Sequence, residues 1–241
     1  MMDRAHIALL TLALCGCGDT SPNQRAPELA AAPAAVVPTD SAADAICRGL
    51  TNSYRCAQAI ERTLLTAANG NVVRTGRHLR IALGRGDTLV FTDSLPDDPA
   101  GTWFSYRGLI AAVGYHLIEV QYYEGGRYLF VNGRTGWIGS SNGVPVIAPD
   151  GSRLAAGNVD LEAEYSPTTL QIWSVAADSL ILEFDHDFVA SPVTADSVWG
   201  PRNLEWLNPT ELRFAREFSL GATNGTARVV FDSVRWRILV P

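Results

Sequence analysis

Apolar and polar residues alternate along most of the chain from residue 71 onward, which is the pattern of half-buried β-strands. In residues 78–83, leucine and isoleucine side chains alternate with arginine and alanine. Further runs of this kind cover residues 72–74, 88–92, 109–113, 115–123, 128–131, 170–175 and 180–184. Asn-Gly dipeptides at 132–133 and 142–143 predict tight hairpin turns between strands. The pattern predicts a mainly β, antiparallel domain over residues 71–241.

Residues 42–70 follow a helical period instead. Cys56, Ile60 and Leu64 fall on one face of a helix predicted at 54–65, and a shorter helix is predicted at 41–47. Gly49 and the polar residues 51–53 supply the break and the N-cap between them.

Two cysteines in this helical segment, Cys47 and Cys56, predict a disulfide that closes a helical hairpin, as an oxidising compartment would allow. A loop this short would stabilise the fold by about 2–3 kcal/mol in the chain-entropy model. The alternative is a metal or redox pair, but the spacing is not CxxC and no histidine lies nearby.

The first residues have the layout of a secretory signal, in which a short basic start precedes an apolar run over residues 7–14. This run is too short to cross ~30 Å of hydrocarbon, which needs about 20 residues. Its ending, Leu14-Cys15-Gly16-Cys17, resembles the lipobox of bacterial lipoproteins, where the cysteine after a small residue is lipidated and becomes the new first residue. The resemblance implies a lipid on Cys17, because bulky Leu14 precedes Cys15.

The segment that follows is rich in alanine and proline, has no aromatic residue and reads as a disordered tether. The predicted organisation is a signal peptide at 1–16, the tether at 17–41, the helical segment at 42–70 and the β domain at 71–241. No aspartate follows Cys17 directly, so we expect an exported protein, lipid-anchored in the outer membrane and facing the periplasm or the cell surface. The net charge of −6 argues against nucleic acid as a partner.

Two segments of the β domain look like copies of each other. Residues 145–156 contain a strand, a Pro149-Asp150-Gly151 turn and a second strand, and residues 204–214 repeat this arrangement around Asn208-Pro209-Thr210. The first copy is similar to the turn of TolB-type and WD-repeat-like β-propeller blades. The resemblance covers roughly residues 104–240 and implies a small or incomplete β-propeller-like fold of about three to four sheet units. The alternative is a β-sandwich, because four blades of ~40–45 residues would need nearly every available residue.

Two groups of acidic residues are candidates for chemistry. In a strand, Asp185 and Asp187 share one face and His186 points to the other, so strand-end residues are favoured over a metal site. The acidic residues of the second group occur at every second position. This spacing favours a solvated strand face over a calcium site, because a calcium site needs a loop curved around the ion. It consists of Asp160, Glu162 and Glu164.

Most aromatic residues occupy alternating strand positions typical of a core. Trp103, Trp137 and Trp199 instead lie beside glycine or proline in predicted loops, where they would form a binding patch if they gathered at one end of the domain. No nucleophile elbow, zinc-protease motif, dinucleotide fingerprint or phosphate loop is present in the sequence. We expect no cofactor and no metal.

The sequence favours a lipid-anchored binding module that contacts a protein, peptide or glycan of the cell envelope. The alternative is a hydrolase of envelope polymers, in which two carboxylates ~5–9.5 Å apart act as acid and base. They would come from Asp160, Glu162, Glu164, Asp185 and Asp187.

The lipobox predicts the outcome of a single substitution. Cys17→Ser should leave the full-length precursor uncleaved in cells, because the acceptor of the lipid is missing. Mass spectrometry of the unsubstituted protein should find acyl groups on Cys17. Acyl groups on Cys15, or an unmodified soluble product, would contradict this prediction.

Overall fold

The computed structural model describes residues 37–38, 40–95, 98, 100–193 and 197–241. The predicted signal peptide, Cys17 and most of the tether lie outside the described residues. Two helices, α1 (Asp40–Cys47) and α2 (Ser53–Ala67), confirm the predicted helical segment, and a disulfide joins Cys47 to Cys56. The Asn52 side chain accepts the Arg55 backbone N–H at 3.1 Å and caps α2. Within the described residues, no helix has the length and apolar character needed to span a membrane.

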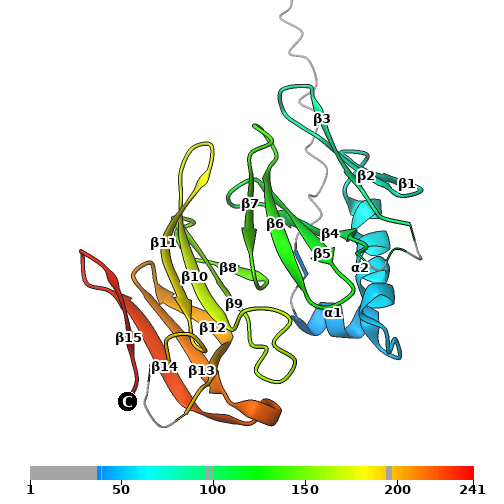
Figure 1. Ribbon diagram of the computed structural model, residues 1–241. Helices are drawn as coiled ribbons and strands as arrows, with labels where there is room; N and C mark the ends of the chain where they lie inside the picture. Colours follow the sequence, from blue (N-terminus) through cyan, green and yellow to red (C-terminus); the bar gives the residue numbers. More distant parts are fainter. Residues whose placement is uncertain (1–36, 39, 96–97, 99, 194–196) are drawn as a thin grey trace, which may run out of the picture. The chain divides into compact units, whose positions relative to one another are not determined.

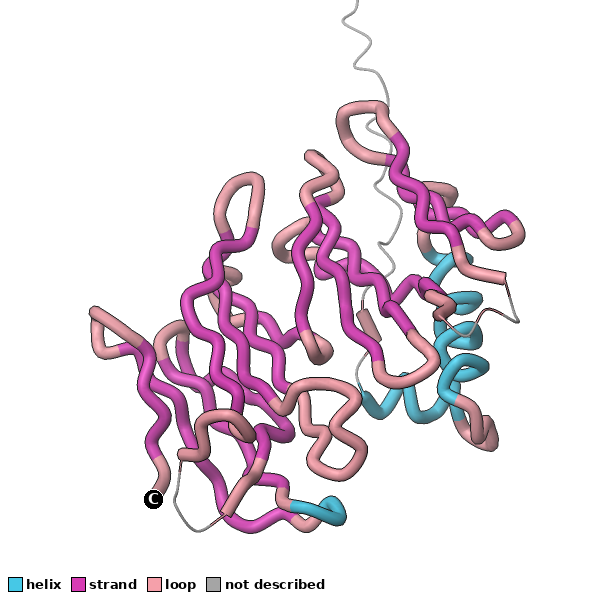
Figure 2. Tube along the Cα trace, viewed as in Figure 1, coloured by secondary structure: helices cyan, strands magenta, loops and turns pink. Residues whose placement is uncertain are grey.

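Strands dominate the rest of the described chain and form four antiparallel sheets, so the mainly β prediction is confirmed (Figures 1 and 2). The first sheet contains β1 (Val72–Thr75), β2 (His78–Ala82) and β3 (Thr88–Thr92). The second contains β4 (Trp103–Ile110), β5 (Tyr115–Gln121), β6 (Gly126–Asn132) and β7 (Ile138–Ser141). The third contains β8 (Pro145–Ile147), β9 (Arg153–Gly157), β10 (Thr169–Val175) and β11 (Leu180–Asp187). The fourth contains β12 (Gly200–Asn208), β13 (Glu211–Glu217), β14 (Thr223–Phe231) and β15 (Trp236–Leu239).

Within every sheet the strands are neighbours in chain order, so each sheet is a meander. The two similar segments are the first hairpins of the third and fourth sheets, β8–β9 and β12–β13. Asp150 Oδ1 accepts the Ser152 N–H at 2.9 Å, and Asn208 Oδ1 accepts the Thr210 N–H at 2.9 Å. The same side-chain turn therefore persists in the second copy, although Asp-Gly has been lost there.

Two local predictions are wrong. The strand expected at 109–113 ends at Ile110, and a turn follows in which the Val113 N–H donates to the Ile110 carbonyl at 3.1 Å. Asn142-Gly143 does not close a hairpin but carries the chain from β7 in the second sheet to β8 in the third. A Cβ on Gly143 would lie 2.0 Å from the Gly157 carbonyl oxygen, so this crossing requires glycine.

The burial pattern shows which sheets lie between others. In β5, the consecutive residues Leu117 and Ile118 are both fully buried and pack into two different hydrophobic cores. In β13, by contrast, Leu212 and Phe214 are buried while Arg213 between them is exposed. A strand buried on both faces has apolar neighbours on both sides. The second and third sheets are therefore enclosed, whereas the fourth is covered on one face.

The open face of the fourth sheet is charged. Ion pairs join Arg202 to Glu217 at 2.8 Å, Arg213 to Glu205 at 2.5 Å and Arg228 to Glu211 at 2.7 Å. Such exposed pairs add little stability individually. A polar outer face is, however, what a terminal unit of a stacked protein needs for solubility.

A buried ion cluster attaches α2 to the first two sheets. The Arg74 guanidinium of β1 contacts both oxygens of Glu61 in α2 at 2.8 Å, and it contacts Asp93 Oδ2 at 2.9 Å. Glu61 is only 5% exposed and Asp93 only 8%. Burial is the main influence on the Asp93 carboxyl and raises its pKa, while Arg74 acts in the opposite direction.

The same cluster closes the edge of the second sheet, where β4 is the outermost strand. Glu61 accepts the Tyr106 N–H and Asp93 accepts the Phe104 N–H, both at 2.8 Å. Arg74 donates to the Phe104 carbonyl. Side chains therefore already form hydrogen bonds with backbone groups that an unprotected edge strand would leave free to pair with another chain.

Replacing Arg74 tests the importance of this cluster. Arg74→Met should lower the free energy of unfolding by about 3–5 kcal/mol near neutral pH, because two buried carboxylates lose their partner. The loss should shrink toward about pH 5, since burial raises the pKa of Asp93 and this carboxyl can then be protonated without its partner. Urea denaturation at both pH values measures this. Arg80→Met, at an exposed position of β2, is the matched control. Equal effects of the two substitutions would contradict the prediction.

Candidate functional site

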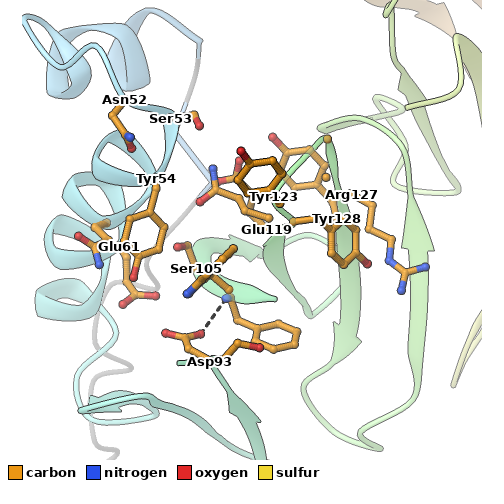
Figure 3. A pocket seen from close by; sticks show the side chains of 18 of the residues that line it. Asn52, Ser53, Tyr54, Glu61, Asp93, Ser105, Glu119, Tyr123, Arg127 and Tyr128 are labelled. Carbon is orange, nitrogen blue, oxygen red and sulfur yellow. Dashed lines mark hydrogen bonds between the residues drawn. The ribbon is translucent and has the colours of Figure 1, made fainter. Parts of the chain in front are cut away.

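A pocket with a volume of about 930 Å³ lies between α2, the end of the second sheet and a loop of the third sheet. Figure 3 shows Tyr54 and Glu61 of α2 on one side of it and Tyr123 and Tyr128 on the other. The volume is at the upper end of the range of ~300–1,000 Å³ found for small-molecule sites.

The floor of the pocket follows from the strand register. Ser105 of β4, Glu119 of β5 and Tyr128 of β6 are directly opposite one another and form one row across the sheet. Two residues further along, Trp103 pairs with Gln121 and forms a second row. Because side chains two residues apart share a face, both rows face the pocket, and the described lining contains all five residues.

Two oxygen atoms in this floor are buried and accept no hydrogen bond, Glu119 Oε2 and Gln121 Oε1. Arg107 Nη1 lies 3.4 Å from Glu119 Oε2, which makes an ion pair without hydrogen-bond geometry. Burial raises the pKa of Glu119, and Arg107 partly counteracts this. Unsatisfied buried acceptors cost free energy, and protein atoms cover both of these oxygens almost completely.

Aromatic side chains form the walls. Tyr54 meets Trp103 edge-on, with ring centroids 6.0 Å apart, and burial raises the pKa of the Tyr54 hydroxyl. The Arg127 guanidinium lies 5.8 Å from the centre of the Tyr122 ring. Tyr123 is 78% exposed, so its ring is accessible at the rim.

The α2 side of the pocket begins within the loop that the Cys47–Cys56 disulfide closes. Asn52, Ser53 and Tyr54 line the pocket and lie between Cys47 and Cys56 in the sequence. The Asn52 carboxamide is also the cap of α2. The disulfide and the cap therefore fix the same wall of the pocket.

The opposite wall comes from the loop that contains the first acidic group. Asp160 Oδ1 accepts the N–H groups of Ala163 and Glu164, and Asp160 Oδ2 accepts that of Ser166 at 2.9 Å. The strand expected for Asp160, Glu162 and Glu164 is therefore wrong. A carboxylate that bonds its own backbone competes with strand pairing, and here it folds a loop. Ser166 Oγ then donates to the Gly126 carbonyl at 3.3 Å, which brings this loop to the pocket.

Three of the other proposed carboxylates, Glu162, Asp185 and Asp187, have structural partners. Glu162 accepts the Leu220 N–H at 2.8 Å. Asp187 ends β11 and accepts two backbone N–H groups of the following turn, whereas Asp185 lies 3.4 Å from the Gln171 amide nitrogen. The described lining of the pocket contains none of the five carboxylates proposed for an acid–base pair.

The three proposed binding tryptophans occupy different environments. Trp103 lines the pocket. Trp137 packs edge-on against Tyr115, with ring centroids 6.2 Å apart, beside the core between the second and third sheets. Trp199 is 1% exposed and belongs to the core between the third and fourth sheets. The structure does not bring these three side chains together.

No group of three or more His, Cys, Asp or Glu side chains in the described part of the chain is arranged to hold a metal ion. The His186 ring is stacked on that of Phe184, with ring centroids 6.1 Å apart, and lies edge-on to that of Phe188, with ring centroids 4.6 Å apart. His116 is buried, and burial lowers its pKa to about 4, so its imidazole is neutral near neutral pH.

The key residues of the floor, Glu119 and Gln121, were missed from the sequence, although they carry a signal. Along β5, Tyr115 and Leu117 are buried core residues, and Glu119 and Gln121 continue the same face of the strand. Polar side chains at positions where the period demands apolar ones indicate that the core ends there and a site begins.

Comparisons of this chain with protein-family models, with curated proteins and with solved structures gave no match. The geometry of the pocket is therefore the basis for any statement about function.

The disulfide predicts a link between the helical hairpin and the pocket wall. A Cys47→Ser, Cys56→Ser double substitution should lower stability by about 2–3 kcal/mol and speed hydrogen exchange in residues 42–66, because that segment opens locally. Amides of β10 and β13 should keep their protection and serve as the internal control. Unchanged protection of α2, or labelling of both thiols in the native protein, would overturn the prediction.

Proposed function

We propose that this protein is a binding module of the cell envelope, anchored by a lipid on Cys17, and that its ligand occupies the pocket between α2 and the end of the second sheet. The anchor rests on the lipobox-like Leu14-Cys15-Gly16-Cys17. The disulfide supports an oxidising compartment, where such bonds persist.

The observation that carries the proposal is the composition of the pocket. Its floor is a β-sheet, and aromatic rings and carboxamide side chains together line it. Binding sites are typically concave and aromatic with a few placed polar groups.

The alternative, a hydrolase with paired carboxylates, has less support. Glu61 and Asp93 line the pocket, but both are held by Arg74 and by backbone N–H groups. Glu119 is paired with Arg107. A general acid and base need free access to the substrate's proton, and the described carboxylates of the pocket serve structural partners.

We further propose that the four sheets correspond to the blades of an incomplete propeller. The support is that the second, third and fourth sheets are consecutive four-stranded meanders and that two of them begin with the same side-chain turn. Burial of β5 on both faces favours a stack of sheets over a β-sandwich, in which each sheet is covered on one face, and the one-sided burial of the fourth sheet indicates that the stack is open.

A photo-crosslinking experiment tests the binding function. A benzophenone amino acid at Tyr123, on the rim of the pocket, should form an adduct with an envelope component in intact cells, because benzophenone inserts into C–H bonds of peptides and sugars alike. The same probe at Val234, which is 85% exposed in the turn between β14 and β15, is the matched control. Adding Gln121→Met, which changes a side chain that lines the pocket, to the Tyr123 probe should reduce the adduct. Equal adducts at both positions, or none at either, would refute the proposal.

A further inference from the structure

We propose that the pocket beside α2 binds an organic anion, whose charged group lies near Arg62 and the N-terminus of α2 and whose apolar part packs on the aromatic rings. This inference rests on the proposed binding function and names the class of its ligand. The argument uses the arginines of the lining, the start of α2 and the rings beside them.

The positive charges of the pocket are the first observation. The described lining contains the arginines Arg62, Arg74, Arg77 and Arg127. Arg74 is occupied by buried carboxylates, whereas no ion pair joins the other three to an acidic residue of the described chain. Arg62 and Arg127 are exposed, so a ligand in the pocket has access to guanidinium groups without a counter-charge.

The acidic residues of the lining do not cancel this charge. They are Glu61, Asp93 and Glu119. The first two are paired with Arg74 and the third with Arg107. Arginines therefore outnumber carboxylates around the pocket, and the local charge is positive although the whole chain carries a net charge of −6. A cleft with an excess of one charge attracts ligands of the opposite charge.

The start of α2 adds to the positive potential. Figure 3 shows Asn52, Ser53 and Tyr54 on the α2 side of the pocket, and all three line it. Backbone N–H groups in the first turn of a helix have no carbonyl partner within the helix, and the aligned peptide dipoles give this end a partial positive charge. The first turn of α2 contains no acidic residue that would balance the dipole. An anion is therefore stabilised at this end of the pocket.

The same face of α2 carries both a charge and a ring. Tyr54, Gln58 and Arg62 recur at every fourth residue of the helix, and all three line the pocket. Residues four apart are neighbours on a helix surface, so the Arg62 guanidinium and the Tyr54 ring face the same space. The Tyr54 ring in turn meets Trp103 edge-on. A ligand with an apolar group next to its negative charge can contact all of them.

The charges disfavour basic and neutral ligands. A basic ligand would need free carboxylates, and those of the described lining are paired with arginine. A neutral ligand would leave the guanidinium groups without a counter-charge. Carboxylates and phosphates both suit arginine, because its planar fork donates two parallel hydrogen bonds to either group. The experiment below therefore separates these two anionic groups.

The test is titration of the full-length protein, purified in a non-ionic detergent, with three tyrosine derivatives of similar size. N-acetyltyrosine carries a carboxylate, N-acetyl-O-phosphotyrosinamide a phosphate and N-acetyltyrosinamide no charge. Chemical shifts of the backbone amides of α2 report binding. The better anion should bind at least about 10-fold more tightly than the neutral amide, because hydrogen bonds between charged groups are the stronger ones. Its identity gives the anionic group of the ligand. Equal binding of all three compounds would overturn the inference.

Two arginine substitutions test the location of the site. Arg62→Gln and Arg127→Gln should each weaken binding of the better anion by about 3- to 10-fold and leave binding of the neutral amide unchanged. Both arginines are exposed, so the melting temperature should stay the same. Arg80→Gln removes the same charge from an exposed position of β2 outside the described lining, and it should not change the affinity. An equal loss in Arg80→Gln, or no loss in either lining variant, would overturn the inference.

The crosslinking probe separates a failure of this inference from a failure of the binding function. If neither anion binds more tightly than the neutral amide but the probe at Tyr123 forms an adduct that the probe at Val234 does not, the anionic ligand is wrong and the binding function stands. If the anions show no preference and no adduct forms, both proposals are wrong.

Discussion

The contact between Arg74 and two buried carboxylates is the constraint on which the N-terminal half of the structure depends. Glu61 comes from α2, Arg74 from β1 and Asp93 from the end of β3, so one guanidinium joins three separate parts of the chain. The carboxylates in turn bind the backbone of β4. If the guanidinium were missing, both carboxylates would be buried without a counter-charge, and β4 would lose the Arg74 hydrogen bond to the Phe104 carbonyl. All 19 basic residues of the chain are arginine, whose planar fork suits such bidentate pairing better than lysine does.

This ion cluster also fixes two sides of the pocket relative to each other. Glu61 and Asp93 line the pocket and also hold β4 against α2, so the floor and the helical wall cannot move independently. The opposite wall is fixed separately, by Asp160 within its loop and by Ser166 on Gly126. A site whose walls are each held by hydrogen bonds loses little conformational entropy when a ligand binds.

The sequence predicted those parts of the fold that local signals encode. The two helices, the Cys47–Cys56 disulfide and the hairpins β8–β9 and β12–β13 all depend on periodicity, caps and turn residues close in the chain. Asn142-Gly143 was misread because such a dipeptide favours a tight turn but does not determine which strands then pair. Asp160 was misread because its alternation with apolar residues is typical of a strand, whereas its side chain bonds its own backbone. Of the proposed site residues that the structure describes, only Trp103 lines the pocket. Glu61 and Asp93 could not be recognised from the sequence because their buried partner, Arg74, comes from another strand.

The two ends of the stack are stabilised differently, and this explains where the covalent bond lies. The fourth sheet has four strands and packs Trp199, Trp206 and Trp236 into its core, so apolar burial alone can hold it. The first sheet has three short strands, with alternating burial in β2 and β3. Its partner α2 contributes few large apolar side chains to the core, chiefly Ile60 and Leu64. Hydrophobic burial is therefore less extensive at this end of the structure. The disulfide and the Arg74 cluster offset that deficit at the location where the site needs a fixed wall.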